Sequence, residues 1–178
     1  MGRHLVDYRQ LYHPDHDRKI LWILQRKNAS TSILELMKCR SMIMVEETLP
    51  FRDYYTITIV RHPWARVTSG MYNPYGHGPR TFAQKVQEEI LDRETPRDID
   101  PHLWPQWVAL EGFRVDRWLH FERLDDDWKA LQADFDLPDM VQMNVGDGHQ
   151  WRDQDFDWNL LLPLYEPDFA FCEDWERE

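Results

Sequence analysis

The chain has 178 residues, a length that suits one domain with a substantial hydrophobic core. Its 21 Lys and Arg residues are outnumbered by 32 Asp and Glu residues, and the formal net charge of −11 argues against a protein that coats nucleic acid or docks on an anionic membrane. The hydrophobic fraction of 42% is too high for a disordered acidic chain, so we expect a folded protein in which any anionic ligand meets a local basic pocket.

The first predicted elements are a strand at residues 20–24 and a helix over residues 31–40. The strand is a continuous apolar run, typical of a strand buried on both faces, and the helix has apolar side chains at helical spacing. A polar stretch at residues 25–28 separates them. The order is therefore strand, polar turn, helix.

A second unit follows the same order. Aromatic and β-branched residues at 54–60 predict a strand, which the basic turn Arg61-His62-Pro63 interrupts. Residues 64–72 then predict a helix with the proline in its first turn.

The remaining chain adds one more strand and several helices. An amphipathic helix is predicted at 81–91, a charged loop at 93–101 and a strand at 115–121. The helix predicted at 124–135 carries three aspartates in its first turn, where they complement the helix dipole. The tail, residues 158–175, contains two prolines that forbid one long helix, so short helices packed against the sheet are expected.

Strands that alternate with helices favour an α/β fold with a parallel sheet. We expect a three-layer α/β/α arrangement around a short central parallel sheet. No repeat or Gly/Ser linker divides the chain, which predicts a single domain over residues 1–178.

Both polar turns come after a strand and before a helix, where ligands bind in open α/β sheets. The first turn has two cations and three hydroxyls at the start of the predicted helix, and such groups can bind a phosphate or sulfate. Its residues are Arg26, Lys27, Asn28, Ala29, Ser30, Thr31 and Ser32. It contains no glycine and is not a Walker A loop. Helix capping by Ser30 or Thr31, with both cations in solvent, explains the same residues equally simply.

The second turn has another group of residues that could bind an anion. Arg61 ends its strand and Ser69 lies two turns into the next helix, so both can face one anion with Arg66 nearby. Pairing with surface acids is an alternative role for Arg66. Two anion-binding turns that follow two strands predict a ligand with two anionic groups.

The two turns together resemble the cofactor-binding signatures of sulfotransferases that use 3′-phosphoadenosine 5′-phosphosulfate (PAPS). The second signature, R-[DH]-P-x-x-R-x-x-S-x-Y, is matched at Arg61, Pro63, Arg66, Ser69 and Tyr72. The first, P-K-x-x-x-T-S, is matched less fully. Its lysine, threonine and serine are Lys27, Thr31 and Ser32, whereas Arg26 replaces a common proline and Ala29 a frequent glycine.

More of the chain is similar to the carbohydrate branch of that family, which includes the chondroitin and heparan 2-O enzymes. Residues 100–106 resemble its D-P-H-W-x-P-Q segment, residues 121–124 its [FY]-E-x-L strand end, and residues 137–171 its L-P…N…L…Y-x-x-D-F ending. The resemblance spans about residues 20–172. The Golgi members have a membrane anchor and a luminal stem, which this sequence lacks, so we expect a bacterial or viral member.

The resemblance implies a P-loop-NTPase-like sulfotransferase fold, PAPS as sulfuryl donor and no metal. Lys27 would lie near the oxygen that bridges phosphate and sulfate. Thr31 and Ser32 would bind the 5′-phosphate, and Arg61 and Ser69 the 3′-phosphate, with assistance from Arg66.

A base must take the proton of the acceptor hydroxyl, and histidine suits this role near neutral pH. His102, in the family-like segment, is the first candidate, and His77, between two glycines, is the second. Glu35 is the third, because some relatives use a carboxylate. His62 is expected instead to order the turn at Arg61.

The acceptor is expected to be a carbohydrate or another small hydroxyl compound. Trp104, Trp107 and Trp151 are candidates for stacking on a sugar, although core packing is the ordinary role of tryptophan. The acidic net charge disfavours a densely sulfated acceptor unless a basic strip compensates locally. That strip would comprise Arg80, Lys85, Arg93 and Arg97.

Two other functions remain open. One is a catalytically silent module that binds a nucleotide or glycan on the same fold, and the other is a P-loop-like nucleotide kinase, which the missing Walker motif disfavours. The sequence shows no apolar signal region, no run of about 18 apolar residues and no N-myristoylation pattern. We therefore expect a soluble, cytoplasmic protein.

Overall fold

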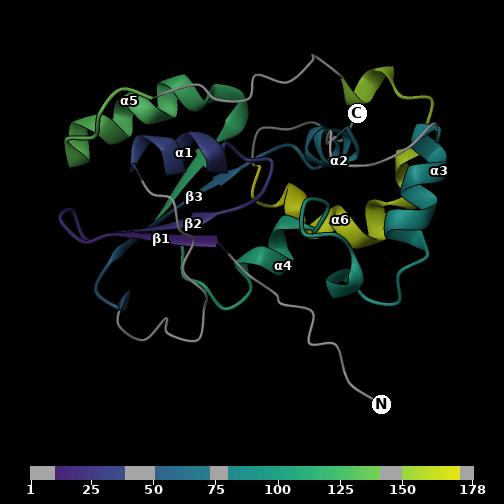
Figure 1. Ribbon diagram of the computed structural model, residues 1–178, viewed down its shortest axis with the longest axis horizontal. Helices are drawn as coiled ribbons and strands as arrows, with labels where there is room; N and C mark the ends of the chain where they lie inside the picture. Colours follow the sequence, from purple (N-terminus) through teal and green to yellow (C-terminus); the bar gives the residue numbers. More distant parts are fainter. Residues whose placement is uncertain (1–10, 39–50, 73–79, 141–149, 173–178) are drawn as a thin grey trace.

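The computed structural model describes residues 11–38, 51–72, 80–140 and 150–172 (Figure 1). Within them, four strands form one sheet in the order β1-β2-β3-β4. They are β1 (Leu11–Asp15), β2 (Ile20–Leu24), β3 (Tyr55–Val60) and β4 (Arg117–His120). β2, β3 and β4 are parallel, as predicted, but β1 pairs antiparallel with β2. The sheet is therefore mixed, and the expectation of a purely parallel sheet is corrected.

β1 was not predicted, because Pro14 interrupts its pattern. A proline cannot donate to a strand ladder, but it is tolerated in an edge strand. β1 is such an edge strand, with Pro14 opposite Leu21 of β2. A tight turn joins the two strands and places Lys19 at a positive φ of 53°.

Four of the next five α-helices were predicted closely or in part, whereas α4 (Gln106–Leu110) was not predicted. The five are α1 (Ser30–Leu36), α2 (Pro63–Met71), α4, α5 (Leu124–Phe135) and α6 (Leu162–Phe169). α5 has the predicted bounds, and α2 is displaced by one residue. α1 ends at Leu36, before the predicted end at residue 40. The tail forms short helices, as expected, and α6 contains both of its prolines.

The helix predicted at 81–91 is divided into two parts. α3 (Phe82–Val86) is α-helical and begins with a capping box between Thr81 and Gln84, whereas Gln87–Leu91 is a π-helical segment. Short 3-10 helices occupy Pro96–Asp98, Phe121–Arg123, Trp151–Asp153 and Trp158–Leu160.

Three groups of buried side chains hold these elements together. α1 and α5 cover one face of the sheet, where Trp22 of β2 stacks on Trp128 of α5 with ring centroids 5.7 Å apart (Figure 1). The opposite face packs against Leu110 of α4, aromatic residues of the following loop and Cys172. α2, α3, α4 and α6 form a third group with its own apolar core beside the sheet.

The tail contributes to both of the latter groups. Tyr165 and Phe169 of α6 pack in the helical group, whereas Phe171 stacks on Trp118 of β4 with ring centroids 5.0 Å apart. In the part of the chain that the structure describes, no helix combines the length and apolar character needed to cross a membrane.

Candidate functional site

The two polar turns lie side by side because β2 and β3 are parallel neighbours and the turns follow their carboxyl ends. A buried glutamine, Gln106 of α4, joins them. Its Oε1 accepts hydrogen bonds from Asn28 Nδ2 at 2.7 Å and from the Arg61 backbone N–H at 2.8 Å, and its Nε2 donates to the Arg61 carbonyl at 2.8 Å. One side chain therefore fixes the first turn, the second turn and α4 relative to one another.

Asp168 of α6 holds the start of α4 in place. Its two carboxylate oxygens accept hydrogen bonds from the backbone N–H groups of Gln106 and Trp107, each at 2.8 Å. Complete burial raises the pKa of Asp168 to about 6, although these N–H groups and the positive charge of Arg66 oppose the rise. The acid thereby links the helical group to the two turns.

The first turn has an unusual backbone. Lys27 and Ala29 have positive φ values of 69° and 57°, a left-handed conformation that favours glycine. The turn is held by Asn28, whose Nδ2 also donates to the Ile59 carbonyl at 2.9 Å. The glycine that the sulfotransferase signature often has at position 29 would relieve this strain.

Arg61 lies between the first turn and the end of β4. Its guanidinium donates to the Lys27 carbonyl at 3.0 Å, and its Cζ lies 4.2 Å from the centroid of the Phe121 ring. Glu122 acts electrostatically on Arg61 and accepts a hydrogen bond from the His62 backbone N–H at 3.1 Å. The carboxyl ends of three parallel strands thus meet around this arginine.

Arg66 is buried, with 2% of its surface exposed. It donates to the Trp104 carbonyl and lies in the field of Tyr165 and Asp168. The alternative that it pairs with surface acids is therefore wrong. Arg66 therefore connects three parts of the fold: its own helix α2, the segment that precedes α4, and α6.

Four cations lie around the two turns, Arg26, Lys27, Arg61 and Arg66, and we name them the cation cluster. None of the four forms an ion pair with an acid among the described residues, and the Nε atoms of all three arginines are buried without a hydrogen bond. Burial, followed by the charges of Arg61 and Arg66, lowers the pKa of Lys27. Cations without a close ion pair, and with unused N–H groups, are suited to an anion.

His102 lies next to the cation cluster. Its Nε2 is 3.0 Å from an Arg26 guanidinium nitrogen, and its Nδ1 is 2.7 Å from Asp100 Oδ1. The hydrogen bond from His102 is the main reason that the pKa of Asp100 falls to about 2. The structure therefore brings the first candidate base to the first turn.

The other predicted site residues lie around the cation cluster or away from it. Thr31 and Glu35 of α1 are exposed, and Ser32 is buried. Ser30 and Ser69 are partly buried at the start of α1 and in the second half of α2. In the described part of the chain, Glu35 makes no hydrogen bond or ion pair with the cation cluster. His77 lies outside the described residues.

His62 caps α2, which agrees with its expected role in ordering the turn. Its Nδ1 accepts the Trp64 backbone N–H at 3.2 Å, and its ring stacks on Trp151 with centroids 4.9 Å apart. Burial, followed by the charges of Arg152 and Arg61, lowers its pKa to about 4, so the ring is neutral at pH 7.

Sequence reasoning missed the residues that connect the turns. Gln106 is part of the family-like segment at 100–106, which was its only signal, and Asp168 is part of the C-terminal resemblance. Both act through backbone groups that are far away in the sequence. Neither role follows from spacing alone.

Two of the three tryptophans that were candidates for stacking on a sugar are buried. Trp104 and Trp151 are 5% and 9% exposed, which leaves no face for stacking on a sugar, and Trp107 is partly buried with its Nε1 donating to the Leu164 carbonyl. These tryptophans belong to the apolar core of the helical group or pack against it.

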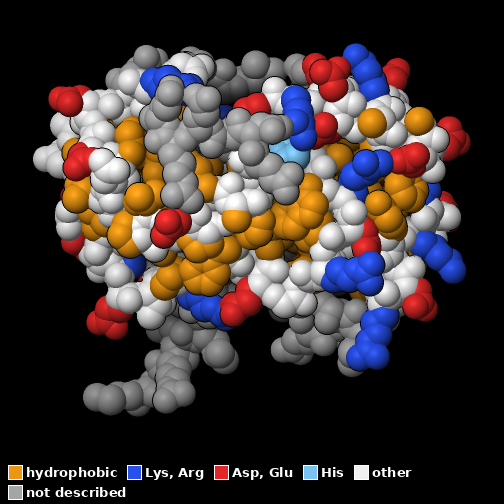
Figure 2. Space-filling view, turned by 180° about the vertical axis from the view of Figure 1, so that it is seen from behind, with side chains coloured by type: hydrophobic (Ala, Val, Ile, Leu, Met, Phe, Trp, Pro, Cys, Tyr) orange, Lys and Arg blue, Asp and Glu red, His pale blue; other side chains and the backbone are white. Residues whose placement is uncertain are grey.

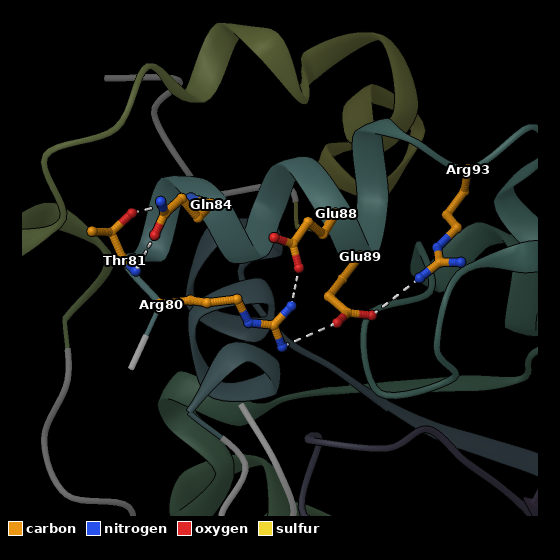
Figure 3. Close-up of polar contacts among 6 residues, drawn as sticks. All are labelled: Arg80, Thr81, Gln84, Glu88, Glu89 and Arg93. Carbon is orange, nitrogen blue, oxygen red and sulfur yellow. Dashed lines mark hydrogen bonds and ion pairs between the residues drawn. The ribbon is translucent and has the colours of Figure 1, made fainter. Parts of the chain in front are cut away.

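The arginines that could have formed a basic strip for a sulfated acceptor are paired with neighbouring acids. Arg80 contacts Glu88 and Glu89, and Arg93 contacts Glu89 at 3.3 Å (Figure 3). Arg97 pairs with Glu111. On the face shown in Figure 2, basic side chains are likewise scattered among acidic and apolar ones. These arginines do not form a patch for a polyanion.

No protein-family model matches the sequence, and no curated protein or solved structure shows significant similarity to it. The described residues also contain no group of three or more His, Cys, Asp or Glu side chains placed to hold a metal ion. The assignment of a function therefore depends on the geometry of the site and on the sequence signatures.

Proposed function

We propose that the protein is a sulfotransferase that moves the sulfuryl group of PAPS to a hydroxyl of a carbohydrate. The observation that supports this proposal is the cation cluster, which gathers Arg26, Lys27 and Arg61 at the carboxyl ends of β2 and β3 without a close ion pair to any described acid. We also propose that the mixed sheet and its helices are a compact form of the three-layer, P-loop-like fold of that family.

The residues present fit a donor with two anionic groups. The buried Nε atoms of Arg26 and Arg61 have no hydrogen-bond partner, and the Lys27 ammonium makes no hydrogen bond or ion pair within the described residues. A buried donor without a partner costs about 1–3 kcal/mol. An anion that accepts from these groups would remove that cost.

The donor supplies an activated sulfuryl group whose leaving group is a nucleotide phosphate. In our proposal, Lys27 neutralises the charge that develops on that leaving group, and Arg61 with Ser69 binds a second phosphate. Ser30, Thr31 and Ser32 lie at the start of α1, beside the turn, and would add hydroxyl donors. Asn28 and Ala29 set the path of the turn, and Arg66 donates a hydrogen bond to the Trp104 carbonyl and adds positive charge near Lys27 and Arg61.

His102 is the base that the geometry favours over Glu35. Its ring lies 3.0 Å from Arg26 of the turn, whereas Glu35 is exposed on α1. The acceptor is proposed to be a neutral carbohydrate, since the arginines that could have formed a basic strip are paired with Glu88, Glu89 and Glu111.

A transfer assay tests this proposal. PAPS labelled in its sulfuryl group is incubated with the protein and neutral oligosaccharides, and labelled product is measured. Replacing the general base should lower the rate about 100-fold or more in His102→Ala, whereas Glu35→Ala should leave it nearly unchanged. Arg93→Gln, which breaks an exposed ion pair away from the turns, serves as the control.

Two outcomes would contradict the proposal in different ways. A protein that binds the nucleotide but transfers label to no hydroxyl compound would be the catalytically silent binding module. Loss of transfer in Glu35→Ala with normal transfer in His102→Ala would assign the base to Glu35.

A further inference from the structure

The His102 ring is held at both of its nitrogens. Nδ1 is 2.7 Å from Asp100 Oδ1, the same oxygen that accepts the His102 backbone N–H at 2.8 Å. Nε2 is 3.0 Å from Arg26. The side chain of His102 is 28% exposed, so solvent and solutes can reach this part of the site.

The chemistry of the two partners determines where the proton of the ring lies. An ionised carboxylate only accepts hydrogen bonds, and a guanidinium only donates them. Because the pKa of Asp100 is about 2, its carboxylate is ionised at neutral pH. Nδ1 must therefore carry the proton, and Nε2 must present its lone pair to Arg26. A doubly protonated ring would direct an N–H group at the N–H groups of Arg26.

This arrangement orients His102 as a base, but it also blocks the basic nitrogen Nε2. A histidine that donates from Nδ1 to a carboxylate and keeps its lone pair on Nε2 is oriented for proton abstraction. Here, however, Arg26 occupies that lone pair. The acceptor hydroxyl of the proposed reaction would have to compete with a guanidinium for the same atom.

The interactions that keep the Arg26 guanidinium beside His102 are weak. Its hydrogen-bond partner is a neutral nitrogen, its Nε is buried without a partner, and Asp100 acts on it only through space, without a close ion pair. Its charge is also close enough to Lys27 to lower the pKa of that lysine. A phosphate or sulfate oxygen beside Lys27 would be a stronger acceptor for Arg26 than the imidazole, because charge-assisted hydrogen bonds are about twice as strong as neutral ones.

We propose that Asp100 is a positioning residue that fixes the proton of His102 on Nδ1, and that Arg26 masks the basic Nε2 until an anion in the cation cluster draws its guanidinium away. The inference rests on the proposed function, in which His102 is the base. The unmasked Nε2 takes the proton of the acceptor hydroxyl, and the resulting imidazolium keeps its Nδ1–H on Asp100. The base thus becomes available only when the anionic donor is bound.

Nuclear magnetic resonance of the histidine rings in the full chain tests the ligand-free arrangement. Long-range ¹H–¹⁵N spectra at mildly alkaline pH distinguish the two neutral tautomers and report whether the bare nitrogen accepts a hydrogen bond. His102 should be the Nδ1–H tautomer with a hydrogen-bonded Nε2. Arg26→Met should shift the Nε2 resonance downfield, and Asp100→Ala should produce a mixture of tautomers. Arg93→Met, a matched arginine outside the site, should change neither.

Titration with 3′-phosphoadenosine 5′-phosphate, which lacks the sulfuryl group, tests the unmasking. At saturation, the Nε2 resonance of the wild type should move to the position seen in Arg26→Met, and that of Arg26→Met should stay where it was. Loss of the Arg26 contact should also weaken nucleotide binding about tenfold.

The outcomes separate this inference from the proposed function. An unchanged Nε2 resonance in Arg26→Met, or a retained Nδ1–H tautomer in Asp100→Ala, would overturn the masking or the positioning role. Nucleotide that binds without moving the Nε2 resonance would overturn the unmasking alone. Absence of nucleotide binding would overturn both the proposed function and the unmasking, while the ligand-free spectra would still decide the role of Asp100.

Discussion

Gln106 is the residue through which the two turns contact each other. It is 0% exposed, and its amide satisfies the backbone N–H and carbonyl of Arg61 as well as one N–H of Asn28. Gln106→Leu keeps the approximate volume but leaves these buried groups without partners. We expect the free energy of unfolding to fall by about 2–4 kcal/mol, measured by urea denaturation.

A glutamine at the surface provides the control for this substitution. Gln87 is exposed, and its side chain bonds only to Asp92 in the described structure. Gln87→Leu should change the free energy of unfolding by no more than about 0.5 kcal/mol. Equal effects of the two substitutions would show that Gln106 does not connect the turns.

At the scale of the elements, the start of α2 makes the stability of the protein depend on pH. His62 is 8% exposed, and its pKa is about 4 in the folded protein. In the unfolded chain the value is about 6.5. As the pH falls below 6.5, the unfolded chain takes up a proton that the folded protein does not, so stability falls until the pH reaches the folded value. Above this window His62 contributes no pH dependence.

The variant His62→Asn isolates this contribution, since asparagine also accepts a hydrogen bond at a helix start. The difference in the free energy of unfolding between wild type and variant should shrink by about 2 kcal/mol between pH values of about 7.5 and 5. Other titrating groups, including Asp168, cancel in this difference. A difference that is constant over the same range would show that His62 is not buried in its neutral form.

α2 also requires a glycine to approach the His102 segment. A Cβ at Gly70 would overlap the Leu103 side chain and lie 2.9 Å from the His102 carbonyl oxygen. Within a helix, alanine is otherwise favoured over glycine by about 0.5–1 kcal/mol. We nevertheless expect Gly70→Ala to be destabilising by about 1–3 kcal/mol. Thermal and urea unfolding measure the sign, and an increase in stability would contradict the close contact.

The sequence predicted the elements that carry a local signal. The apolar run at 20–24, the β-branched run at 54–60 and the helix at 124–135 were all identified, because their patterns match the period of the structure that they form. β1 was missed because Pro14 interrupts its pattern, and the proline is tolerated only because β1 lies at the edge of the sheet. The π-helical segment after Val86 was missed because it differs from an α-helix in hydrogen bonding and not in composition.

In the site, too, the sequence revealed local motifs but not the contacts between distant segments. The cations of the two turns were visible in the sequence as two motifs. The burial of Arg66 and the contact of His102 with Arg26 depend on chain segments that are far apart in sequence, so spacing could not reveal them. The paired state of Arg80 and Arg93 required the helical geometry that brings Glu88 and Glu89 beside them.

For the whole molecule, the central feature is a cluster of cations in a chain whose net charge is −11. Acids balance the outer arginines, whereas Arg26, Lys27, Arg61 and Arg66 lack ion-pair partners among the described residues. The excess of acid elsewhere repels polyanions, so the cluster suits a small anionic ligand that reaches the strand ends.

Calorimetric titration with 3′-phosphoadenosine 5′-phosphate tests this account most directly, with ATP for comparison and with Lys27→Ala, Arg61→Ala and the control Arg93→Gln. We predict micromolar binding to the wild type and the control, with ATP much weaker. Each of the two site variants, checked for folding, should lose about 1.5–3 kcal/mol, which is about tenfold or more in affinity. A folded wild-type protein that does not bind the nucleotide, or that binds ATP equally well, would contradict the account.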